Sequence, residues 1–460
     1  MKCQYLLLST LPFAYSAEAL AQTTQEQPQN MIWVFGDQHR AQALGYMGDP
    51  NANTPNLDAL AQESITFTNA FSGCPWSTPF RGSLFTGLYP NKAVYRTPQK
   101  LDPTLPMVSD AFNEHGYITA LYGKWHLNGH NKKTFVPKDE RGRFDIWLAY
   151  ENNNAQYDVH LHGHDIWGRE DDNALAEKLE GYETDALTDK VIEFLRNRPK
   201  DKPFFIVLSV QPPHDPYIAP AEYMEKYSAD SIILRINVPP IKRLEDDARR
   251  ELAGYYAQIE NLDMNVGRLY SALEELGLLE TTNLAFFSDH GDCHYSHGYT
   301  RKSSPWQESV NIPFIFRPAG GRAEGVAAQS DVMFQTVDIA PTSLGMCGIE
   351  TPEYMMGFDF SQVLTDGVVV EGVPDAVLLQ HIYPKDFRCL DRPWRGLVTS
   401  DGWKYVVVEN QPIMMFDLNE DPYELNNVVY LAPYREKRAV LAAKLQEMLD
   451  KVGDEFVVTQ

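Results

Sequence analysis

Two side chains that could act as nucleophiles lie close together in the stretch SGCPWSTPFRGSLFTG, residues 72–87: Cys74 and Ser77. A thiol is the stronger nucleophile near neutral pH, because part of it is ionised. The pair Thr78-Pro79, however, is typical of a helix N-cap followed by the first helical residue. Ser77 would then lie just outside a helix start, where backbone N–H groups favour an anion. Helix geometry therefore favours Ser77, with a spare capping hydroxyl as the alternative.

Three cations and two histidines could serve an anionic substrate beside this nucleophile. An arginine one helical turn after Ser77 would point toward the same anion and offer it two N–H groups. Lysines add positive potential, and histidines exchange protons near neutral pH. A lone lysine or histidine is more often a surface or structural residue, so the combination is what indicates a site. The five residues are Arg81, Lys124, Lys302, His126 and His214.

Four further side chains are suited to a divalent cation. Asp37 and Gln38 follow one apolar run, and Asp289 and His290 follow another. Oxygen donors with a single imidazole suit Ca²⁺, Mg²⁺ or Mn²⁺ better than Zn²⁺. Either pair alone would more often belong to a turn or a cap. Their shared position at strand ends favours a metal site formed by both pairs.

These residues need a sheet that brings them together. Five apolar runs read as strands, and they are continuously apolar rather than alternating, which is typical of a sheet covered on both faces. Apolar residues at three- and four-residue steps from Ile259 to Leu273 predict an amphipathic helix. The pattern predicts an α/β fold with a mainly parallel sheet, in which ligands bind beyond the carboxyl ends of the strands. The runs are Met31–Asp37, Tyr117–Gly123, Phe204–Val210, Asn283–Asp289 and Ile312–Phe316.

The pattern changes after about residue 370. GLVTSDGWKYVVV contains two β runs joined by Ser-Asp-Gly, which predicts a hairpin. PIMMFDL adds a strand, and EKRAVLAAKLQEMLDKV adds a closing helix. We therefore expect a catalytic α/β domain over residues 22–370 and a small antiparallel subdomain with its closing helix over 371–460.

The first 21 residues read as a signal peptide. Lys2 is a short basic region, YLLLSTLPFA is an apolar core, and Ala19-x-Ala21 predicts cleavage near Ala21/Gln22. A poorly ordered apolar tail is the alternative. The apolar core is too short to span a membrane, and no later segment is long enough. We expect export, most simply to a periplasm.

Length, composition and charge limit the domain organisation and the classes of ligand. A chain of 460 residues, 43% of them hydrophobic, can form one large domain and a smaller one. The net charge of −23 excludes a broad nucleic-acid footprint and means that an anionic substrate must be held by local positive charge. Four cysteines outside the signal lack zinc spacing, and one or two disulfides could form in an exported protein; they are Cys74, Cys293, Cys347 and Cys389.

The motifs, taken in their order along the chain, resemble those of the formylglycine-dependent (type I) sulfatases of the alkaline-phosphatase-like superfamily. The resemblance extends from about Gln29 to the C-terminal subdomain. STPFRGSLFTG is similar to the family signature of Cys or Ser, any residue, Pro, usually Ser, Arg, and a terminal Thr-Gly. The resemblance implies a large mainly parallel sheet sandwiched by helices, with a smaller antiparallel sheet. The other blocks are TPNLDALAQESITFTNAF, GYITALYGKWHLNG, PPHDPY, SDHGDCHYSHG, KSSPWQESVNIP and MFDLNEDPYELNN.

The resemblance also implies the nucleophile. Ser77 occupies the position that becomes formylglycine (3-oxoalanine), as in the serine-type subclass, whose serine a radical-type maturase oxidises in the cytosol before export. The hydrated aldehyde is a gem-diol. One of its oxygens would attack sulfur, and the other would later expel sulfate. Cys74 then has no catalytic role.

Roles for the remaining residues follow from the same resemblance. Asp37, Gln38, Asp289 and His290 would hold one divalent cation, usually Ca²⁺, with Mg²⁺ or Mn²⁺ as alternatives. Arg81 and Lys124 would steady the formylglycine and the sulfate, and His126 would take the second diol proton. The residues that bind sulfate and assist the leaving alkoxide would be His214 and Lys302, with His297 of SDHGDCHYSHG as a further substrate-binding candidate.

Three positions depart from the family pattern. Phe80 replaces the usual Ser, Asn128 replaces a usual Gly, and the Gln38/His290 pair replaces the more common Asp and Asn. A Gln/His metal set also occurs in related phosphonate monoester hydrolases. We therefore keep phosphonate or phosphate ester hydrolysis as the alternative function, and a non-catalytic anion-binding relative as the outcome if Ser77 is never oxidised.

The expected substrate is a sulfated carbohydrate, whose identity the motifs do not reveal. Segments outside the motifs, residues 151–172 and 384–395, would contact the sugar. The first of these segments is histidine-rich, and a flexible surface loop is an equal alternative for it. The candidate sugar contacts are His160, His162, His164 and Trp167.

Overall fold

The computed structural model describes residues 28–129, 133–368, 371–383, 390 and 392–459. Its centre is a ten-stranded sheet in the order β11-β2-β10-β9-β1-β8-β4-β5-β6-β7. The strands are β1 Asn30–Gly36, β2 Ile65–Phe67, β4 Ile118–Lys124, β5 Ile146–Tyr150, β6 His160–His164, β7 Glu177–Lys178, β8 Phe204–Ser209, β9 Thr282–Ser288, β10 Phe314–Arg317 and β11 Gln329–Ser330.

The middle of this sheet is parallel, as predicted. β1 pairs in parallel with β9 on one side and β8 on the other, and β8, β4 and β5 continue in parallel. All five predicted strands are present, and the residues of β1, β4, β8 and β9 are buried throughout. β10 is antiparallel to β9, and β6 and β7 add an antiparallel edge. Because β1 lies between strands that follow it in the chain, the sheet has its topological switch point at β1.

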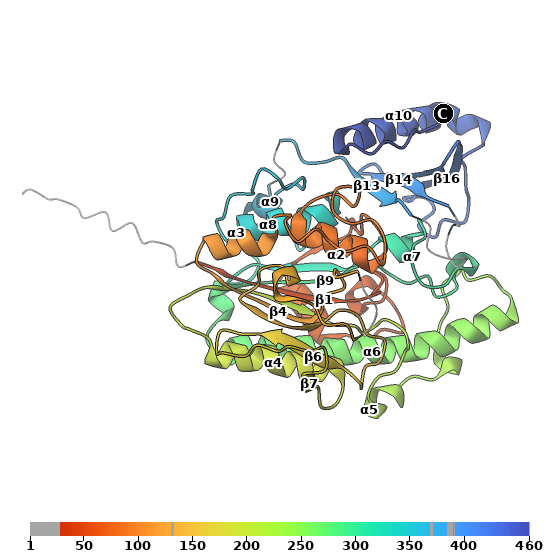
Figure 1. The fold of residues 1–460 in the computed structure, drawn as a ribbon. Helices are drawn as coiled ribbons and strands as arrows, with labels where there is room; N and C mark the ends of the chain where they lie inside the picture. Colours follow the sequence, from red (N-terminus) through yellow and green to blue (C-terminus); the bar gives the residue numbers. More distant parts are fainter. Residues whose placement is uncertain (1–27, 130–132, 369–370, 384–389, 391, 460) are drawn as a thin grey trace, which may run out of the picture.

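Helices cover both faces of the sheet (Figure 1). One apolar core lies between the sheet and α2, α3 and α8, and a second lies on the other face, against α1, α4 and α6. The predicted helix over residues 259–273 is part of the 34-residue α6. The covering helices are α1 Pro55–Gln62, α2 Ser77–Thr86, α3 Val108–Glu114, α4 Glu183–Asn197, α6 Lys242–Glu275 and α8 Ile339–Met346; shorter ones are α5 Ala221–Met224, α7 Gln307–Val310 and α9 Ser361–Asp366.

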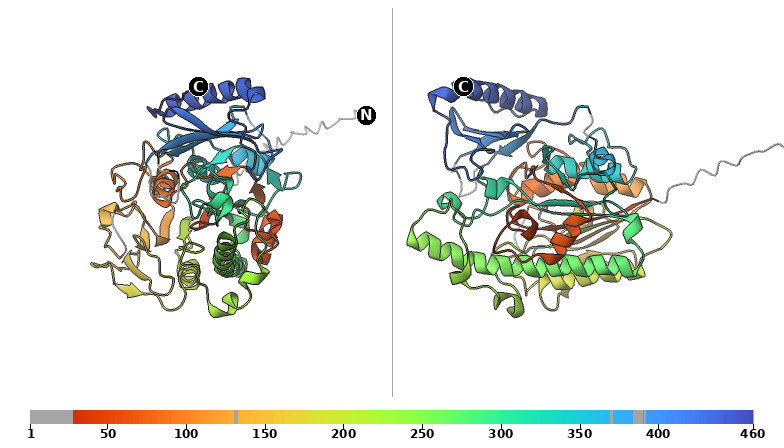
Figure 2. Two further views of the ribbon diagram at one scale, coloured as in Figure 1. Left: turned by 90° about the vertical axis from the view of Figure 1, so that its right-hand side faces the viewer. Right: turned by 180° about the vertical axis from the view of Figure 1, so that it is seen from behind.

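A four-stranded antiparallel sheet follows in the C-terminal part, in the order β13-β14-β15-β16. It lies beyond α2 and α8, and α10 covers its outer face (Figures 1 and 2). The predicted Ser-Asp-Gly hairpin joins β14 to β15. The α/β fold with its smaller antiparallel sheet is therefore confirmed. The elements are β13 Ala376–His381, β14 Trp394–Thr399, β15 Trp403–Val408, β16 Gln411–Asp417 and α10 Arg435–Val452; a two-stranded ladder pairs β3 Ala70–Phe71 with β12 Phe334–Gln335.

Buried charges tie the small sheet to the main body. Lys404 of β15 pairs with Glu424 at 2.5 Å, and both side chains are buried. Glu424 also accepts the backbone N–H of Gln307, the first residue of α7. Breaking a buried pair of this kind leaves an uncompensated charge and destabilises a protein strongly.

The described part of the chain bears on two further predictions. None of its helices is both long and apolar enough to cross a membrane. Cys74, Cys293 and Cys347 are free thiols in it, while Cys3, Cys389 and the predicted signal peptide lie outside it. No disulfide therefore joins the three described cysteines.

Candidate functional site

The predicted site residues meet at the carboxyl end of the central strands. Asp37 and Gln38 follow β1, and Asp289 and His290 follow β9. Lys124 is the last residue of β4, His126 lies two residues further on, and His214 lies on the loop after β8. The continuously apolar strands are held between two cores, so the first polar side chains beyond them converge on one place.

The start of α2 differs from the prediction. The helix begins at Ser77 itself, with Trp76 at the N-cap and no side-chain capping bond, so Thr78 and Pro79 lie inside the first turn rather than at its boundary. Thr78 contacts Thr97 instead of capping the helix. The Ser77 hydroxyl is not a capping group either, because it faces the residues after β1 and β9. The predicted helix end at Gly87 is confirmed, with a left-handed φ of 68°.

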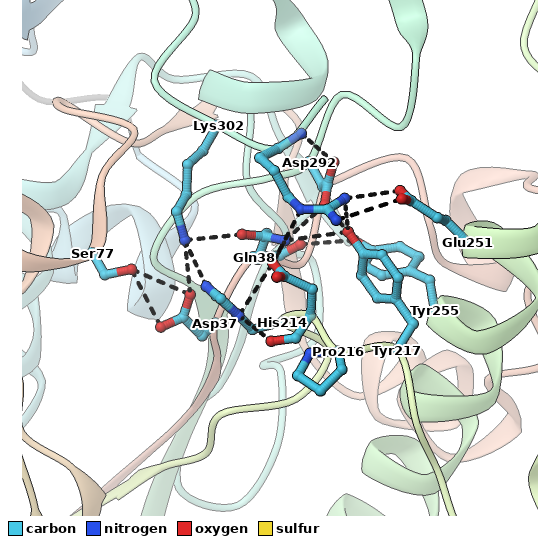
Figure 3. Close-up of polar contacts among 12 residues, drawn as sticks. Asp37, Gln38, Ser77, His214, Pro216, Tyr217, Glu251, Tyr255, Asp292 and Lys302 are labelled. Atoms are coloured by element: carbon cyan, nitrogen blue, oxygen red, sulfur yellow. Dashed lines mark hydrogen bonds and ion pairs between the residues drawn. The ribbon is translucent and has the colours of Figure 1, made fainter. Parts of the chain in front are cut away.

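Ser77 Oγ lies at the centre of the candidate metal ligands. It is 3.2 and 3.3 Å from the two carboxylate oxygens of Asp37 and 3.0 Å from His290 Nε2. Figure 3 shows Ser77 facing the Asp37 carboxylate, with Lys302 approaching the same carboxylate from the other side. The position that the sequence favoured as nucleophile therefore contacts two of the candidate cation ligands, Asp37 and His290.

Basic side chains surround Asp37. Lys124 Nζ lies 2.6 Å from Asp37 Oδ2, and Arg81 Nη2 lies 3.3 Å from the same oxygen. Burial by itself would raise the pKa of Asp37, but Lys124, Lys302 and neighbouring histidines hold it well below its usual range. Arg81 also donates to the Lys124 carbonyl and to Ser209 Oγ. Arg81 lies one helical turn after Ser77 on α2, and both side chains contact Asp37, as the spacing predicted.

The candidate ligands fit a divalent cation. Asp37, Asp289 and His290 offer atoms that lie within 4.8 Å of one another. His290 donates from Nδ1 to the Gly291 carbonyl, so the lone pair of Nε2 faces the site, where Ser77 Oγ lies 3.0 Å away. Asp289 Oδ2 has no hydrogen-bond partner among the described residues. Burial and the Asp37 carboxylate raise the pKa of Asp289 to about 7. A bound cation would relieve both causes, because it compensates two adjacent buried carboxylates.

Gln38 approaches the same site. Its Oε1 accepts from Lys302 Nζ at 2.9 Å, and its Nε2 donates to Asp292 at 2.7 Å. Its backbone adopts a left-handed φ of 74°, and Tyr255 and Asp289 hold this conformation through the Gln38 carbonyl and N–H. A non-glycine residue in this region costs free energy, which is typical of functional sites.

Lys302 and His214 form a pair on the opposite side of the site. Lys302 Nζ lies 2.8 Å from His214 Nε2. His214 Nδ1 lies 2.6 Å from the Asp215 carbonyl, which can only accept, so Nδ1 carries the proton and Nε2 accepts from Lys302. Burial first, and Lys302 second, lower the pKa of His214 to about 3. The imidazole is therefore neutral at pH 7 and accepts a hydrogen bond from Lys302 Nζ.

His126 is the remaining predicted acid–base group. Both of its ring nitrogens are buried and have no hydrogen-bond partner among the described residues. Burial, together with Lys124 and Arg81, lowers its pKa well below the usual range, so the ring is neutral near pH 7. His126 has a left-handed φ of 59° and lines the same cavity as Ser77. A neutral, unpaired imidazole in a reactive cavity can accept a proton.

These side chains line one cavity of about 210 Å³. Beside Ser77, Gln38, Lys124, His126, His214 and Lys302, its wall contains five residues that the sequence did not indicate: Trp76, Thr97, Asp215, Arg301 and Ser303. Asn152 and Asn154 also line it, and both belong to the predicted segment 151–172, directly after a buried strand, where ligands bind in such sheets.

Cys74, Phe80 and His297 do not line this cavity. Cys74 is buried near His381, and burial raises the pKa of its thiol, which disfavours the reactive thiolate. His297 stacks on Trp306 with ring centres 3.6 Å apart, and it does not line the cavity. Phe80 packs between Phe35 and Phe287, so the motif position that usually carries Ser faces the hydrophobic core here.

The predicted segment 151–172 divides into two parts. Asn152 and Asn154 at its start line the cavity, whereas its histidine-rich middle is neither a flexible loop nor part of the cavity wall. This middle part forms β6, in which His162 and His164 are buried. His162 Nε2 accepts from the Val136 backbone, and His164 Nε2 donates to the Phe144 carbonyl. Trp167 is exposed but lies against Phe194 of α4, away from the cavity lining. In the second predicted segment, residues 384–389 and 391 lie outside the described part of the chain.

Comparisons with known proteins give one consistent answer. The sulfatase family model matches residues 29–349, and a model of the N-sulphoglucosamine sulphohydrolase C-terminal region matches residues 296–451. The chain is similar to an ulvan-active sulfatase of Formosa agariphila, with 34% identity over 94% of this chain and 83% of the relative. It is also similar to an endo-4-O-sulfatase of Bacteroides thetaiotaomicron, with 30% identity over 92% of each chain.

A solved structure has the same overall fold. It comes from work on the metabolism of multiple glycosaminoglycans by Bacteroides thetaiotaomicron and superposes with a TM-score of 0.80 at 28% identity. The superposition covers 93% of this chain and 97% of the other. The similarity therefore extends through both sheets rather than being confined to the motif around Ser77.

Proposed function

The chain belongs to the sulfatase family, and from this premise we propose that it hydrolyses sulfate esters of a carbohydrate through an aldehyde made from Ser77. The observation that carries the proposal is the position of Ser77. Its oxygen lies within 3.3 Å of both Asp37 oxygens and of His290 Nε2, at the mouth of a cavity lined by Lys124 and Lys302. A nucleophile, cation ligands and binding groups for an anion thus occupy one place.

The cation site is formed by Asp37, Asp289 and His290. We add Gln38, the residue after Asp37, whose Oε1 also accepts from Lys302 Nζ. When bound, a divalent cation supplies Lewis-acid polarisation of the sulfate and orients it against residue 77. The oxygen-rich donor set favours Ca²⁺, with Mg²⁺ and Mn²⁺ as alternatives. Elemental analysis of the purified protein identifies the ion.

The side chains around Ser77 have separate tasks. Arg81 and Lys124, held by Asp37 and by each other, keep positive charge against the sulfate. Lys302 and His214, whose Nζ and Nε2 atoms lie 2.8 Å apart, bind the sulfate. Together they assist the departing sugar oxygen, to which Lys302 gives a proton. His126 accepts the proton released when sulfate leaves residue 77, because its unpaired ring nitrogens line the cavity.

The part of the cavity beyond these groups suits a sugar. Asn152 and Asn154 lie two residues apart on the loop after β5, and Asn152 Oδ1 is buried without a hydrogen-bond partner among the described residues. Between them, Asn153 is tied to the Ala155 and Asp158 carbonyls, which fixes the loop. Amide side chains accept and donate to hydroxyl groups, so we assign this wall to the hydroxyls next to the sulfate ester.

Substrate profiling tests the proposal directly. Sulfated mono- and disaccharides are incubated with the matured protein, and released sulfate is measured. We expect release from at least one sulfated sugar, and Asn152→Ala should raise the KM for that sugar while leaving kcat/KM for a small aryl sulfate within about threefold. Trp167→Ala is the matched control, because Trp167 is exposed and does not line the cavity. Equal effects of the two substitutions would remove the sugar wall from the proposal.

Hydrolysis of phosphonate or phosphate esters is the second candidate, and the Gln38/His290 pair favours it. Aryl sulfate and aryl phosphonate esters with the same leaving group separate the two functions. A large preference for the phosphonate would overturn the sulfatase assignment.

Maturation and export belong to the same proposal. Ser77 requires a radical-type maturase, and Met1–Ala21 requires removal on export to the periplasm. N-terminal sequencing of protein from the periplasmic fraction should begin near Gln22. A mature chain that retains Met1 would contradict export through this segment.

A further inference from the structure

Gln38 differs from the other cation-site residues because only one orientation of its side-chain amide directs Oε1, rather than Nε2, toward the site. An amide has an oxygen on one side and an NH₂ group on the other. Oε1 lies 2.9 Å from Lys302 Nζ, whereas Nε2 lies 2.7 Å from Asp292 Oδ2 and 3.4 Å from Asp215 Oδ1. The reversed amide would place an oxygen against two carboxylates and an NH₂ group against an ammonium. Electrostatics therefore favours the observed orientation alone.

Asp292 is held firmly in place. Its Oδ1 accepts the backbone N–H groups of His294 and Arg301, both at 2.9 Å. Its Oδ2 accepts the Tyr217 hydroxyl at 2.5 Å as well as the Gln38 amide. Figure 3 shows Asp292 and Tyr217 on the side of Gln38 that faces away from Asp37 and Ser77. Asp292 thus reaches none of the reacting atoms itself.

We propose that Asp292 is a positioning residue of the cation site, which turns the Gln38 oxygen toward the cation by accepting the Gln38 NH₂ group. The same contact makes a neutral amide the fitting side chain at position 38, because a carboxylate there would oppose Asp292. This gives a physical reason for an amide at position 38 in this chain. The inference rests on the proposed function in placing a cation beside Asp37, Asp289 and His290 and in counting Gln38 Oε1 among its ligands.

Substitutions that reverse the hydrogen bond test this role. Asp292→Asn can keep the bonds from His294 and Arg301 to Oδ1 but presents an NH₂ group to Gln38. The Gln38 amide would then turn over and direct its own NH₂ group at the cation. Adding Gln38→Glu restores an oxygen on both sides, because the new amide at position 292 donates to one carboxylate oxygen and the other faces the cation.

The experiment is calorimetric titration of Ca²⁺ and Mg²⁺ into the metal-stripped full chain carrying unmodified Ser77. Binding does not require turnover, so a failure of the sulfatase assignment leaves this test intact. Asp292→Asn should weaken binding by about 10- to 100-fold, as loss of a ligand's outer partner typically does. The double variant D292N/Q38E should return to within about threefold of the wild type. Gln38→Glu alone should gain no affinity, although it adds a negative charge.

Glu251→Gln is the matched acid-to-amide control. Glu251 pairs with Arg301 at 2.8 Å in the same network but does not contact Gln38, so affinity should stay within about twofold. Equal effects of Gln38→Glu in the wild-type and D292N backgrounds would overturn the proposal, as would wild-type affinity in Asp292→Asn. If Asp292→Asn fails to fold, Gln38→Glu decides the question alone, because a tenfold gain in affinity would show that Asp292 does not oppose a carboxylate at position 38.

Discussion

Asp37 is the residue at which the charges of the site meet. Lys124, Arg81 and Lys302 lie 2.6, 3.3 and 3.9 Å from its carboxylate, and Ser77 Oγ lies 3.2 Å away. Asp37 therefore links the basic groups to the nucleophile, and it couples any change at one of them to the others. Effects of substitutions here should be far from additive.

Substituting each of the two candidate nucleophiles, Ser77 and Cys74, shows which of them is needed for sulfate release. Ser77→Ala removes the oxygen that becomes the aldehyde, and we expect sulfate release to fall by at least about a thousandfold, which corresponds to about 4 kcal/mol of transition-state stabilisation. Cys74→Ala should leave kcat within about threefold, because the buried thiol touches no reacting group. Sulfate release by both variants, with folding checked by circular dichroism, tests this. Loss of activity in the Cys74 variant alone would reverse the assignment.

Several candidate site residues could be predicted from the sequence, because each lies at the end of an apolar run that reads as a buried strand; they are Asp37, Gln38, Lys124, Asp289 and His290. Ser77 and Arg81 are instead indicated by the pattern of a helix start. The residues that the sequence did not single out depend on contacts between distant segments. Asp292 meets Gln38 although 254 positions separate them in the chain, and Arg301 and Thr97 reach the cavity wall from segments that no local pattern connects. His297 lies in a recognised motif but turns to Trp306, and no spacing rule could have indicated that.

At the level of elements, β4 and β8 determine where Lys124 lies. Gly123, directly before Lys124, has a φ of 103°, and an added Cβ would lie 2.0 Å from the Ser209 carbonyl oxygen. The two strands can therefore approach each other only with glycine at this position. The close approach also places Ser209 Oγ against the Lys124 carbonyl and Arg81.

Gly123→Ala should therefore affect both stability and chemistry. We expect a loss of about 3 kcal/mol in the free energy of unfolding, from overpacking and backbone strain. We also expect kcat to fall by about a hundredfold, because Lys124 is displaced. Gly116→Ala is the control, since Gly116 also has a positive φ, 79°, but meets no atom within 4 Å. Urea unfolding and kinetics check this, and a Gly123 variant that behaves like the Gly116 variant would contradict it.

The strand β6 gives a prediction about pH. Burial, with Arg141 second, lowers the pKa of His162 to about 4, while Nε2 accepts from the Val136 backbone. Between about pH 6.5 and 4 the unfolded chain takes up a proton that the folded chain refuses, so the free energy of unfolding falls as pH drops through this window. We expect His162 to contribute about 2 kcal/mol to that fall, allowing for solvent screening.

His162→Gln should remove this contribution, because glutamine can accept the Val136 N–H without titrating. The difference in melting temperature between about pH 7.5 and about pH 5 should become smaller than in the wild type. His160→Gln is the control, since His160 lies on the same strand but is only half-buried. If the His162 and His160 variants keep the same pH dependence as the wild type, His162 does not control stability in acid.

The central strands could be predicted because burial on both faces leaves an uninterrupted apolar run. The sheet edges could not. β6 reads HLHGH, a polar segment in which His162 accepts from the Val136 backbone and His164 donates to the Phe144 carbonyl. β2, β7 and β11 have only two or three residues, too few for a periodic pattern. Strands of this kind depend on tertiary contacts that a local pattern does not contain.

At the level of the whole molecule, the charge distribution repels an anionic substrate at long range and attracts it close to the site. The net charge of −23 repels an anion at long range. Within the site, however, Arg81, Lys124 and Lys302 exceed the carboxylates of Asp37 and Asp289, and a bound divalent cation increases this excess. The field is therefore unfavourable at a distance and favourable only close to Ser77.

Salt should therefore act in an unusual direction. Raising the ionic strength from about 10 mM to about 100 mM shortens the screening length from about 30 to about 10 Å and weakens the long-range repulsion. We expect kcat/KM to rise for a polysulfated oligosaccharide and to change much less for a monosulfated sugar on a neutral scaffold. Steady-state kinetics on both substrates at constant divalent-cation concentration check this. A steep fall for the polysulfated substrate would show that its binding is steered by positive charge.

The most direct test of the account is sulfate release as a function of the oxidation state of residue 77. The chain is produced with and without a serine-type radical maturase, and the fraction of peptide lacking two hydrogens at Ser77 is measured by mass spectrometry in the same samples used for turnover of a sulfated sugar. We expect activity to rise in proportion to the oxidised fraction and to vanish when that fraction is zero. Full sulfate release by protein whose Ser77 is entirely unmodified would contradict it.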